Sequence, residues 1–185
     1  MFHNNDTAIG CIYCNHSEQV QQTVRELVAS LLKQFVQDHP VISEWVVSLY
    51  DKHHPRATNP SLDELMDVLR KEIGRYSKVF IIIDALDELV EQNRGHLISN
   101  VQSLGNTVNL MVTSRPLSSI GPIFRGAKSI DIRANDQDVR KYIKHRILDN
   151  SRLSLLVGAE GTLHESISDK ISTNVGGMYV RPSFL

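Results

Sequence analysis

The chain has 185 residues, 41% of them hydrophobic and 22% charged, which is typical of one soluble globular domain or slightly more. Its formal net charge of -1 gives no electrostatic reason to expect binding to nucleic acid or to an anionic membrane. No apolar run reaches the roughly 18 residues that a membrane-spanning helix needs, so we expect a cytoplasmic protein without membrane contact.

The first predicted element is a short strand from Ala8 to Cys14, which contains both cysteines of the chain. Cys11 and Cys14 have the spacing of a zinc or redox motif, but a zinc site needs four ligands and there is no second pair. We therefore interpret them as ordinary strand cysteines in a reducing compartment. Apolar residues at helical spacing from Val20 to Phe35 then predict a helix that ends near Pro40.

A second short helix is expected from Ile42 to Leu49, followed by a loop from Asp51 to Pro60. His53 and His54 in this loop have no partner at metal-ligand spacing, so we expect them in a solvated loop. Ser61 and Glu64 have the spacing of a capping box and predict the start of a helix that ends at Gly74.

Val79 to Asp84 reads as a strand whose apolar residues do not alternate with polar ones. We therefore expect both of its faces to be covered, as in a parallel sheet between helices. Three further segments predict a helix around Leu97–Leu104, a strand over Asn109–Pro116 and a short strand over Ser129–Arg133.

The remaining residues look helical. Asn135 is a plausible cap for a helix from Asp136 to Leu148, and a last helix is expected over Leu163–Val175. Strands and helices alternate before this point, which predicts an α/β fold with a mainly parallel sheet. We assign residues 1–134 to this α/β core and residues 135–185 to a second, smaller helical module.

The acidic residues after the strand Val79–Asp84 are the main functional candidates. Ligands of open α/β sheets bind beyond the carboxyl ends of the strands, where Asp84 and the Thr113–Ser114–Arg115 segment are both expected. An aspartate for Mg²⁺ and an arginine for a phosphate oxygen suit a nucleotide, and Asp87 or Glu88 could orient an attacking water. The alternative is that all three acids only cap and solvate the next helix.

Two segments also carry a family resemblance. "VFIIIDALDEL" (79–89) followed by "LMVTSRP" (110–116) resembles the Walker B and sensor-1 segments of NACHT-type STAND NTPases, and "IDIRANDQDVRKYI" (130–143) is similar to their continuation. Within this group the chain is most similar to the nephrocystin-3-like NTPase module of fungal NACHT and ankyrin proteins. The likeness extends from about Ala8 to Tyr179.

The resemblance implies an incomplete three-layer P-loop NTPase core followed by the beginning of a helical lid. It implies Asp84 as the Mg²⁺ residue, Asp87 or Glu88 as the water-polarising acid, and Arg115, with Thr113 and Ser114, as the nucleotide sensor. ATP or GTP with Mg²⁺ would be the ligand. Such proteins are switches that control self-association, and ankyrin, WD or TPR repeats would be expected in the parent protein.

One expected motif is missing. No G-x-x-x-x-G-K-[ST] phosphate loop occurs in the 185 residues, and "GPIFRGAKS" (121–129) has one residue too many and precedes a strand. The resemblance places the loop and its strand before this sequence, the strand lying in the sheet between those of 109–114 and 129–132. We therefore expect a truncated product, a gene fragment or a mis-assembled gene model, with weak or absent nucleotide binding.

Two other functions remain open. The same scaffold could serve as a protein-interaction module without turnover, because the phosphate loop is absent. A Toprim-like phosphotransferase also ends its strands in acids, but it needs a separate upstream glutamate strand and leaves the "TSRP" segment, 113–116, unexplained.

Overall fold

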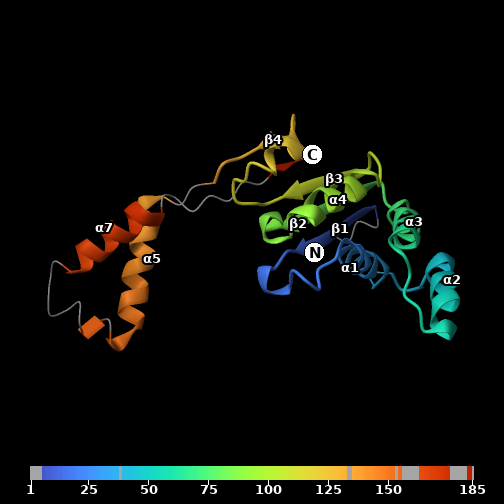
Figure 1. Ribbon diagram of the computed structural model, residues 1–185, viewed down its shortest axis with the longest axis horizontal. Coiled ribbons are helices and arrows are strands. Elements are labelled where there is room, and N and C mark those ends of the chain that lie inside the picture. Colours follow the sequence, from blue (N-terminus) through green and yellow to red (C-terminus); the bar gives the residue numbers. More distant parts are fainter. Residues whose placement is uncertain are drawn as a thin grey trace. The chain divides into compact units, whose positions relative to one another are not determined.

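The computed structural model describes residues 6–37, 39–132, 135–152, 154–155, 163–175 and 183–184. The chain divides into two compact units, Met1–Ile130 with Arg181–Leu185, and Asp131–Val180. Figure 1 shows the elements of each unit in chain order. Within the described ranges, no helix is both long enough and apolar enough to span a bilayer.

The first unit is built on a sheet with strand order β1-β2-β3-β5-β4. Its strands are β1 (Thr7–Tyr13), β2 (Lys78–Asp84), β3 (Val108–Val112), β4 (Lys128–Ser129) and β5 (Ser183–Phe184). β1, β2 and β3 are parallel, whereas β5 pairs antiparallel with both β3 and β4. The predicted α/β class is confirmed: the fold is an incomplete three-layer arrangement around three parallel strands.

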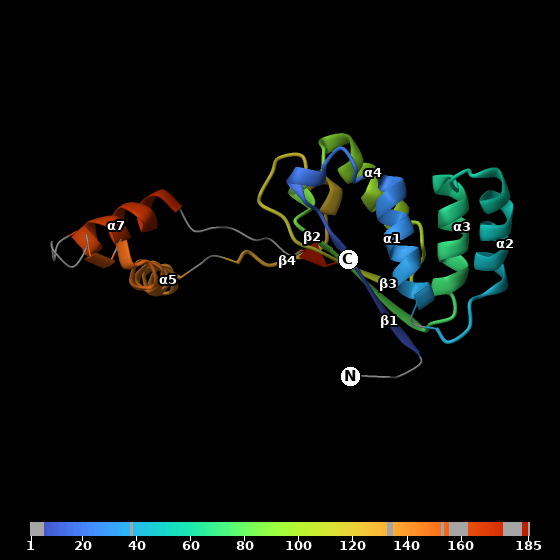
Figure 2. The same cartoon turned by 90° about the horizontal axis from the view of Figure 1, so that it is seen from below.

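Helices cover one face of this sheet. They are α1 (Val24–Gln37), α2 (Glu44–His53), α3 (Leu62–Ile73) and α4 (Glu91–Gln102), with the short 3-10 turns η1 (His16–Glu18), η2 (His54–Arg56), η3 (Leu86–Glu88) and η4 (Gly121–Phe124). α1 packs on β1, α4 on β3, α3 beside α1, and α2 beside α3. Figure 2 shows these helices on one side of the three parallel strands.

Within the first unit, the expectation that both faces of β2 are covered is met on one face only. Val79, Ile81 and Ile83 point to the helices and are fully buried, but Phe80 is 37% exposed and Ile82 is only half-buried. The residues of β2 are apolar on both faces of the sheet. Whether a face is covered, however, depends on which elements pack against it. Helices of the first unit pack on one face only.

Several predicted boundaries move because of local hydrogen bonding. The α1 helix starts at Val24 because the Thr23 hydroxyl accepts the Glu26 N–H at 3.3 Å, which leaves Val20 outside the helix and 93% exposed. The predicted loop from Asp51 is partly helical, since α2 continues to His53 and Pro55 is tolerated in the first turn of η2.

The α3 helix follows the sequence prediction closely. The Ser61 hydroxyl accepts the Glu64 N–H at 3.3 Å, and the Glu64 carboxylate accepts the Ser61 N–H at 2.7 Å, which completes the capping box. Gly74 is the C-cap, as expected. The Glu64 pKa is lowered to about 2, chiefly by its hydrogen bond from Lys52 and next by the Ser61 backbone.

The later strands are shorter than predicted. β3 ends at Val112, well before Pro116, and β4 comprises two residues instead of the five expected from Ser129 to Arg133. The position between β3 and β4, which the resemblance gives to a phosphate-loop strand, is occupied by β5 from the end of the chain. Phe184 pairs with Met111 on one side and with Lys128 on the other.

The second unit contains α5 (Asp136–Asp149) and α7 (Leu163–Val175), which contact each other. Asn135 caps α5 by accepting the Gln137 N–H at 3.0 Å, as predicted. Ile143 and Ile147 are buried, whereas Tyr142 is 63% exposed. The side chain of Val139, also expected on the packed face, lies outside the described residues. Whether this unit is the beginning of a helical lid stays a prediction.

Candidate functional site

The carboxyl ends of β2 and β3 lie side by side and bring the predicted residues together. The two strands are parallel, with Ile83 paired to Val112, so Asp84 and Thr113 follow at the same level. The Thr113 hydroxyl donates to an Asp84 carboxylate oxygen and accepts the Ala85 N–H at 2.9 Å. Asp84 is thereby oriented by a residue from the neighbouring strand.

Ala85 turns the chain sharply away from the sheet. Its φ of 54° lies in the left-handed region, which a non-glycine residue adopts rarely and at some cost. One hydrogen bond and one buried side chain hold the turn: the Leu86 N–H donates to the Thr113 carbonyl at 2.9 Å, and the Leu86 side chain is fully buried. The turn leads into η3, which carries Asp87 and Glu88.

Asp87 is bound to Arg115. Its side chain is only 4% exposed, and its two oxygens accept the backbone N–H of Arg115 at 3.0 Å and the Nε–H of the same residue. Burial alone would raise the Asp87 pKa, but the hydrogen bonds and charge of Arg115 together hold this pKa below its ordinary value. Asp87 is therefore ionised at neutral pH, with both oxygens engaged.

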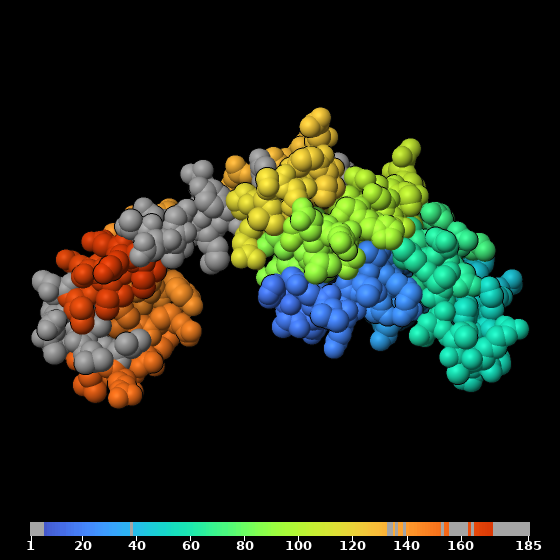
Figure 3. Space-filling view, in the orientation of Figure 1, coloured from blue at the N-terminus to red at the C-terminus, as the bar shows by residue number. Residues whose placement is uncertain are grey.

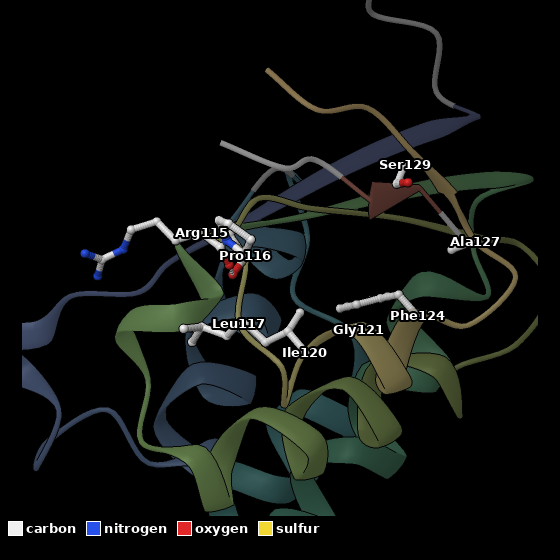
Figure 4. Close-up of a pocket in the computed structure, with 9 residues that line it drawn as sticks. Arg115, Pro116, Leu117, Ile120, Gly121, Phe124, Ala127 and Ser129 are labelled. Atoms are coloured by element: carbon white, nitrogen blue, oxygen red, sulfur yellow. Dashed lines mark hydrogen bonds between the residues drawn. The ribbon is translucent and has the colours of Figure 1, made fainter. Parts of the chain in front are cut away.

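Arg115 is anchored at one end and open at the other. Its side chain is 66% exposed, and Figure 4 shows the guanidinium directed away from the neighbouring pocket. In the described part of the chain, Nε is held by Asp87, while the two terminal nitrogens have no hydrogen-bond partner. Such a group can donate to an anion without leaving Asp87.

Glu88 faces a different segment, the η1 turn. One of its carboxylate oxygens accepts the His16 N–H at 3.0 Å, and its carbonyl accepts from Gln19 Nε2 at 2.6 Å. Glu88 is half-buried, and its second carboxylate oxygen makes no hydrogen bond to the described residues. Of the two candidate acids, Glu88 is the one with an oxygen available to a water.

The same charged side chains affect the pKa of Cys14. Burial, and next the charges of Asp84, Asp87 and Glu88, together raise the pKa of this thiol to about 12 against the opposing effect of Arg94. The Cys14 thiol is thus protonated and unreactive at neutral pH. Both cysteines are free: Cys11 lies in β1 and is half-buried, whereas Cys14, predicted to end the strand, directly follows it and is buried.

The other sensor candidate, Ser114, is not available to a ligand in this structure. Its side chain is buried and its hydroxyl donates to the Arg115 carbonyl at 2.7 Å. It borders a cavity of about 170 Å³ between the end of β3 and η4 (Figure 4). Small-molecule sites usually have about 300 Å³ or more, so this cavity is too small for a nucleotide.

Arg94 is a site residue that sequence reasoning missed. From α4 it donates through Nη2 to the Asp87 carbonyl at 2.7 Å and through Nε to the Leu89 carbonyl at 2.9 Å. A third bond reaches the Ser119 hydroxyl at 3.3 Å. Figure 3 shows the segment after β3, in yellow, against the green surface of η3 and α4. One basic residue in a helix gives no sequence signal for this role, because two of its three partners are backbone carbonyls.

A divalent cation would find few protein ligands here. Among the residues with defined placement, no group of three or more His, Cys, Asp or Glu side chains could hold a metal ion. Asp84 and the Thr113 hydroxyl offer oxygens at one point, which fits Mg²⁺, since this ion is commonly held by one or two protein oxygens together with waters and phosphates. The donor set does not fit a closed zinc site.

Comparison with known proteins gives one match. No curated protein and no solved structure resembles the chain significantly. The family model described as Nephrocystin 3, N-terminal, matches residues 1–115, which is more than half of the chain and includes every candidate site residue. The strand ends, the acidic turn and Arg115 all lie within the matched segment, and the chain is a member of the nephrocystin 3 N-terminal family.

Proposed function

We propose that this chain carries the Walker B and sensor-1 segments of a NACHT-type STAND P-loop NTPase, a nucleotide-dependent signalling switch. The observation that carries the proposal is the pairing of Asp84 with Thr113 and of Asp87 with Arg115 across the ends of two adjacent parallel strands. Acids and an arginine at this edge are the groups that bind a metal–nucleotide complex.

The contacts suggest how the roles divide. Asp84, oriented by Thr113, would hold Mg²⁺ directly or through water, and the ion would supply positive charge to neutralise the phosphates of the nucleotide. Asp87 would serve as the anchor of Arg115, because both of its oxygens are engaged. Glu88 would orient the attacking water, and the open end of Arg115 would contact the terminal phosphate.

The wider assignment is part of the same proposal. ATP or GTP is the ligand class, the helical unit after Asn135 is the beginning of a lid, and switching controls self-association in a parent protein that carries ankyrin, WD or TPR repeats. The similarity of segments 79–89 and 110–116 to Walker B and sensor 1 supports this assignment.

A second candidate is a protein-interaction module on the same scaffold, without turnover. The absence of a G-x-x-x-x-G-K-[ST] sequence favours it for this chain by itself. A phosphate loop supplies several charge-assisted hydrogen bonds of about 1.5–3 kcal/mol each. Without two of them, affinity would fall by about 4 kcal/mol, so a micromolar site would become roughly millimolar.

The first prediction is therefore weak but specific binding of Mg²⁺–ATP, with hydrolysis no faster than background. Titration of the isotope-labelled chain, followed by backbone NMR shifts, is expected to give a dissociation constant of about 1 mM. Shifts should gather at Asp84, Glu88 and Arg115, and Arg115→Ala or Asp84→Asn should remove them.

The control variant is Arg70→Ala, since Arg70 is an exposed α3 cation paired with Asp67, away from the strand ends. It should leave the titration unchanged. Binding that Arg115→Ala and Arg70→Ala affect equally would contradict a specific nucleotide site. No shift at any nucleotide concentration would favour the interaction module.

A further inference from the structure

The face of the sheet opposite the helices is apolar, and no described element of the first unit covers it. Ile9 is 58% exposed and Tyr13 69%, and with Phe80 they alternate with fully or nearly fully buried residues on the helix side. A hollow of about 470 Å³ lies on this face. It is lined by Ile9, Phe80, Ile81, Ile82, Asn109 and Met111, together with Leu110.

Such a face is unusual for parallel strands, which almost always have both faces covered. Contiguous apolar patches with polar rims mark interaction surfaces. Here the rim is polar at both ends of the strands: Thr7 and Lys78 lie at the start, and Asp84 and Thr113 at the end. The apolar residues between them have no cover from the described helices of the first unit.

The charges on this face are self-complementary along its central strand. β2 presents Lys78, Phe80, Ile82 and Asp84 in that order, because these alternate residues share one side. From Asp84 back to Lys78 the order is acidic, apolar, apolar, basic, so the two ends of the strand carry opposite charges. Rotation by 180° about an axis that crosses the strands at Ile81 therefore places Lys78 of one copy opposite Asp84 of the other.

We propose that this face is the interface of a two-fold symmetric dimer, in which two copies stack their sheets face to face with strands antiparallel. Each copy contributes the same patch, as a two-fold interface requires. Phe80 of one copy meets Ile82 of the other at the centre, and two Lys78–Asp84 pairs close the ends. A parallel stack would instead oppose like charges, Lys78 to Lys78 and Asp84 to Asp84.

The sheet's free edge is a poorer route to association. Along β1, the Gln34 side chain from α1 accepts the Cys11 N–H at 2.8 Å and donates to the Cys11 carbonyl at 2.8 Å. It thus occupies the hydrogen-bonding groups that an added strand would need. Lys78 makes no ion pair with the described residues and is available for one across the face.

The size of the patch sets the expected strength. Three strands of five to seven residues cover about 23 Å by 14 Å, or roughly 300 Å² in projection. A standard interface buries about 800 Å² per partner, so the dimer is weak. We expect a dissociation constant of about 10 µM to 1 mM.

Sedimentation equilibrium of the full chain, across this concentration range, tests the proposal. Lys78→Glu and Asp84→Lys each place two like-charged pairs across the dimer, and each should raise the dissociation constant about tenfold or more. An equimolar mixture of the two variants restores both opposite-charge pairs and should associate at least as well as the unmodified chain. The weakening of the single variants distinguishes this arrangement from a parallel stack, which opposes like charges at both positions before and after either substitution.

Two further variants keep the test decisive if Asp84→Lys alters the fold. Ile9→Glu, on the face, should give a monomer, whereas Val20→Glu, at a 93% exposed apolar residue outside the sheet, should leave association unchanged. Circular dichroism confirms that each variant is folded. The proposal would be overturned if the chain stays monomeric throughout this concentration range. It would also be overturned if mixing the Lys78→Glu and Asp84→Lys variants does not restore association. Equal effects of Ile9→Glu and Val20→Glu would overturn it as well.

Discussion

Two acids that are adjacent in sequence have different environments. Asp87 is buried and gives both oxygens to Arg115, while Glu88 is half-buried and gives one oxygen to the η1 turn. The difference arises because η3 turns consecutive residues in different directions from the strand end. Asp87 therefore holds Arg115 in position. Removal of the Asp87 carboxylate would first reduce the order of the segment after β3.

Asp87→Asn is predicted to lower the free energy of unfolding at neutral pH by about 1–2 kcal/mol, because the hydrogen bonds from Arg115 lose a charged acceptor. The loss is no larger because the Arg115 side chain is exposed and water screens its charge. The folded-state pKa of Asp87 is depressed, so its contribution is present above the unfolded pKa and is lost as pH falls through the folded pKa.

The measurement is denaturant unfolding of both proteins at several pH values, and the two stabilities should converge in acid. Asp67→Asn is the matched control, since Asp67 is exposed and pairs only with Arg70 in the described structure. If the difference in free energy of unfolding between Asp87→Asn and the parent chain does not depend on pH, the ionic role of Asp87 is contradicted.

At the scale of elements, α3 shows how local chemistry sets a boundary. The Ser61–Glu64 capping box satisfies N–H groups at the start of the helix, and five apolar residues bury one face against α1 and α2. They are Leu65, Met66, Val68, Leu69 and Ile73. Buried Glu72 belongs to the same helix and accepts the Trp45 Nε1–H of α2 at 2.6 Å, which ties the two helices together.

Ser61→Ala is predicted to destabilise the chain by about 0.5–2 kcal/mol, because the Glu64 N–H loses its acceptor and the reciprocal bond to the Ser61 N–H is left without its counterpart. Thermal unfolding by circular dichroism measures the loss. Ser43→Ala is the comparison at another N-cap serine. Ser43 is the N-cap of α2 but makes no side-chain cap bond, and its hydroxyl donates to Glu72 instead. A Ser61→Ala variant as stable as the parent chain would show that α3 is held by packing alone.

At the scale of the whole molecule, the first unit is one sheet packed on one layer of helices. The two layers come close together at Gly10 of β1, which faces Phe35 and Leu31 of α1. A Cβ at this position would lie 2.8 Å from Phe35 Cζ and 3.0 Å from Leu31 Cδ2. The absence of a side chain at Gly10 therefore sets the distance between helix and sheet.

Gly10→Ala is predicted to cost about 1–3 kcal/mol, since the ring of Phe35 must move within a fully packed core. Gly95→Ala is the matched control: Gly95 lies inside α4 with nothing within 4 Å of its added Cβ, so alanine should stabilise that helix by about 0.5–1 kcal/mol. Opposite signs for the two variants in chemical denaturation confirm the prediction, and equal signs contradict it.

The sequence by itself determined the element types, the capping box at Ser61 and the juxtaposition of Asp84 with Thr113, because periodicity, caps and strand ends are local signals. The tertiary structure alone decided that Asp87 binds Arg115, that Arg94 supports η3, and that the described elements of the first unit leave one face of its sheet uncovered. These depend on contacts between segments distant in sequence and on which elements pack together. Residue type shows that Phe80 and Ile82 are apolar, but only packing shows whether anything covers them.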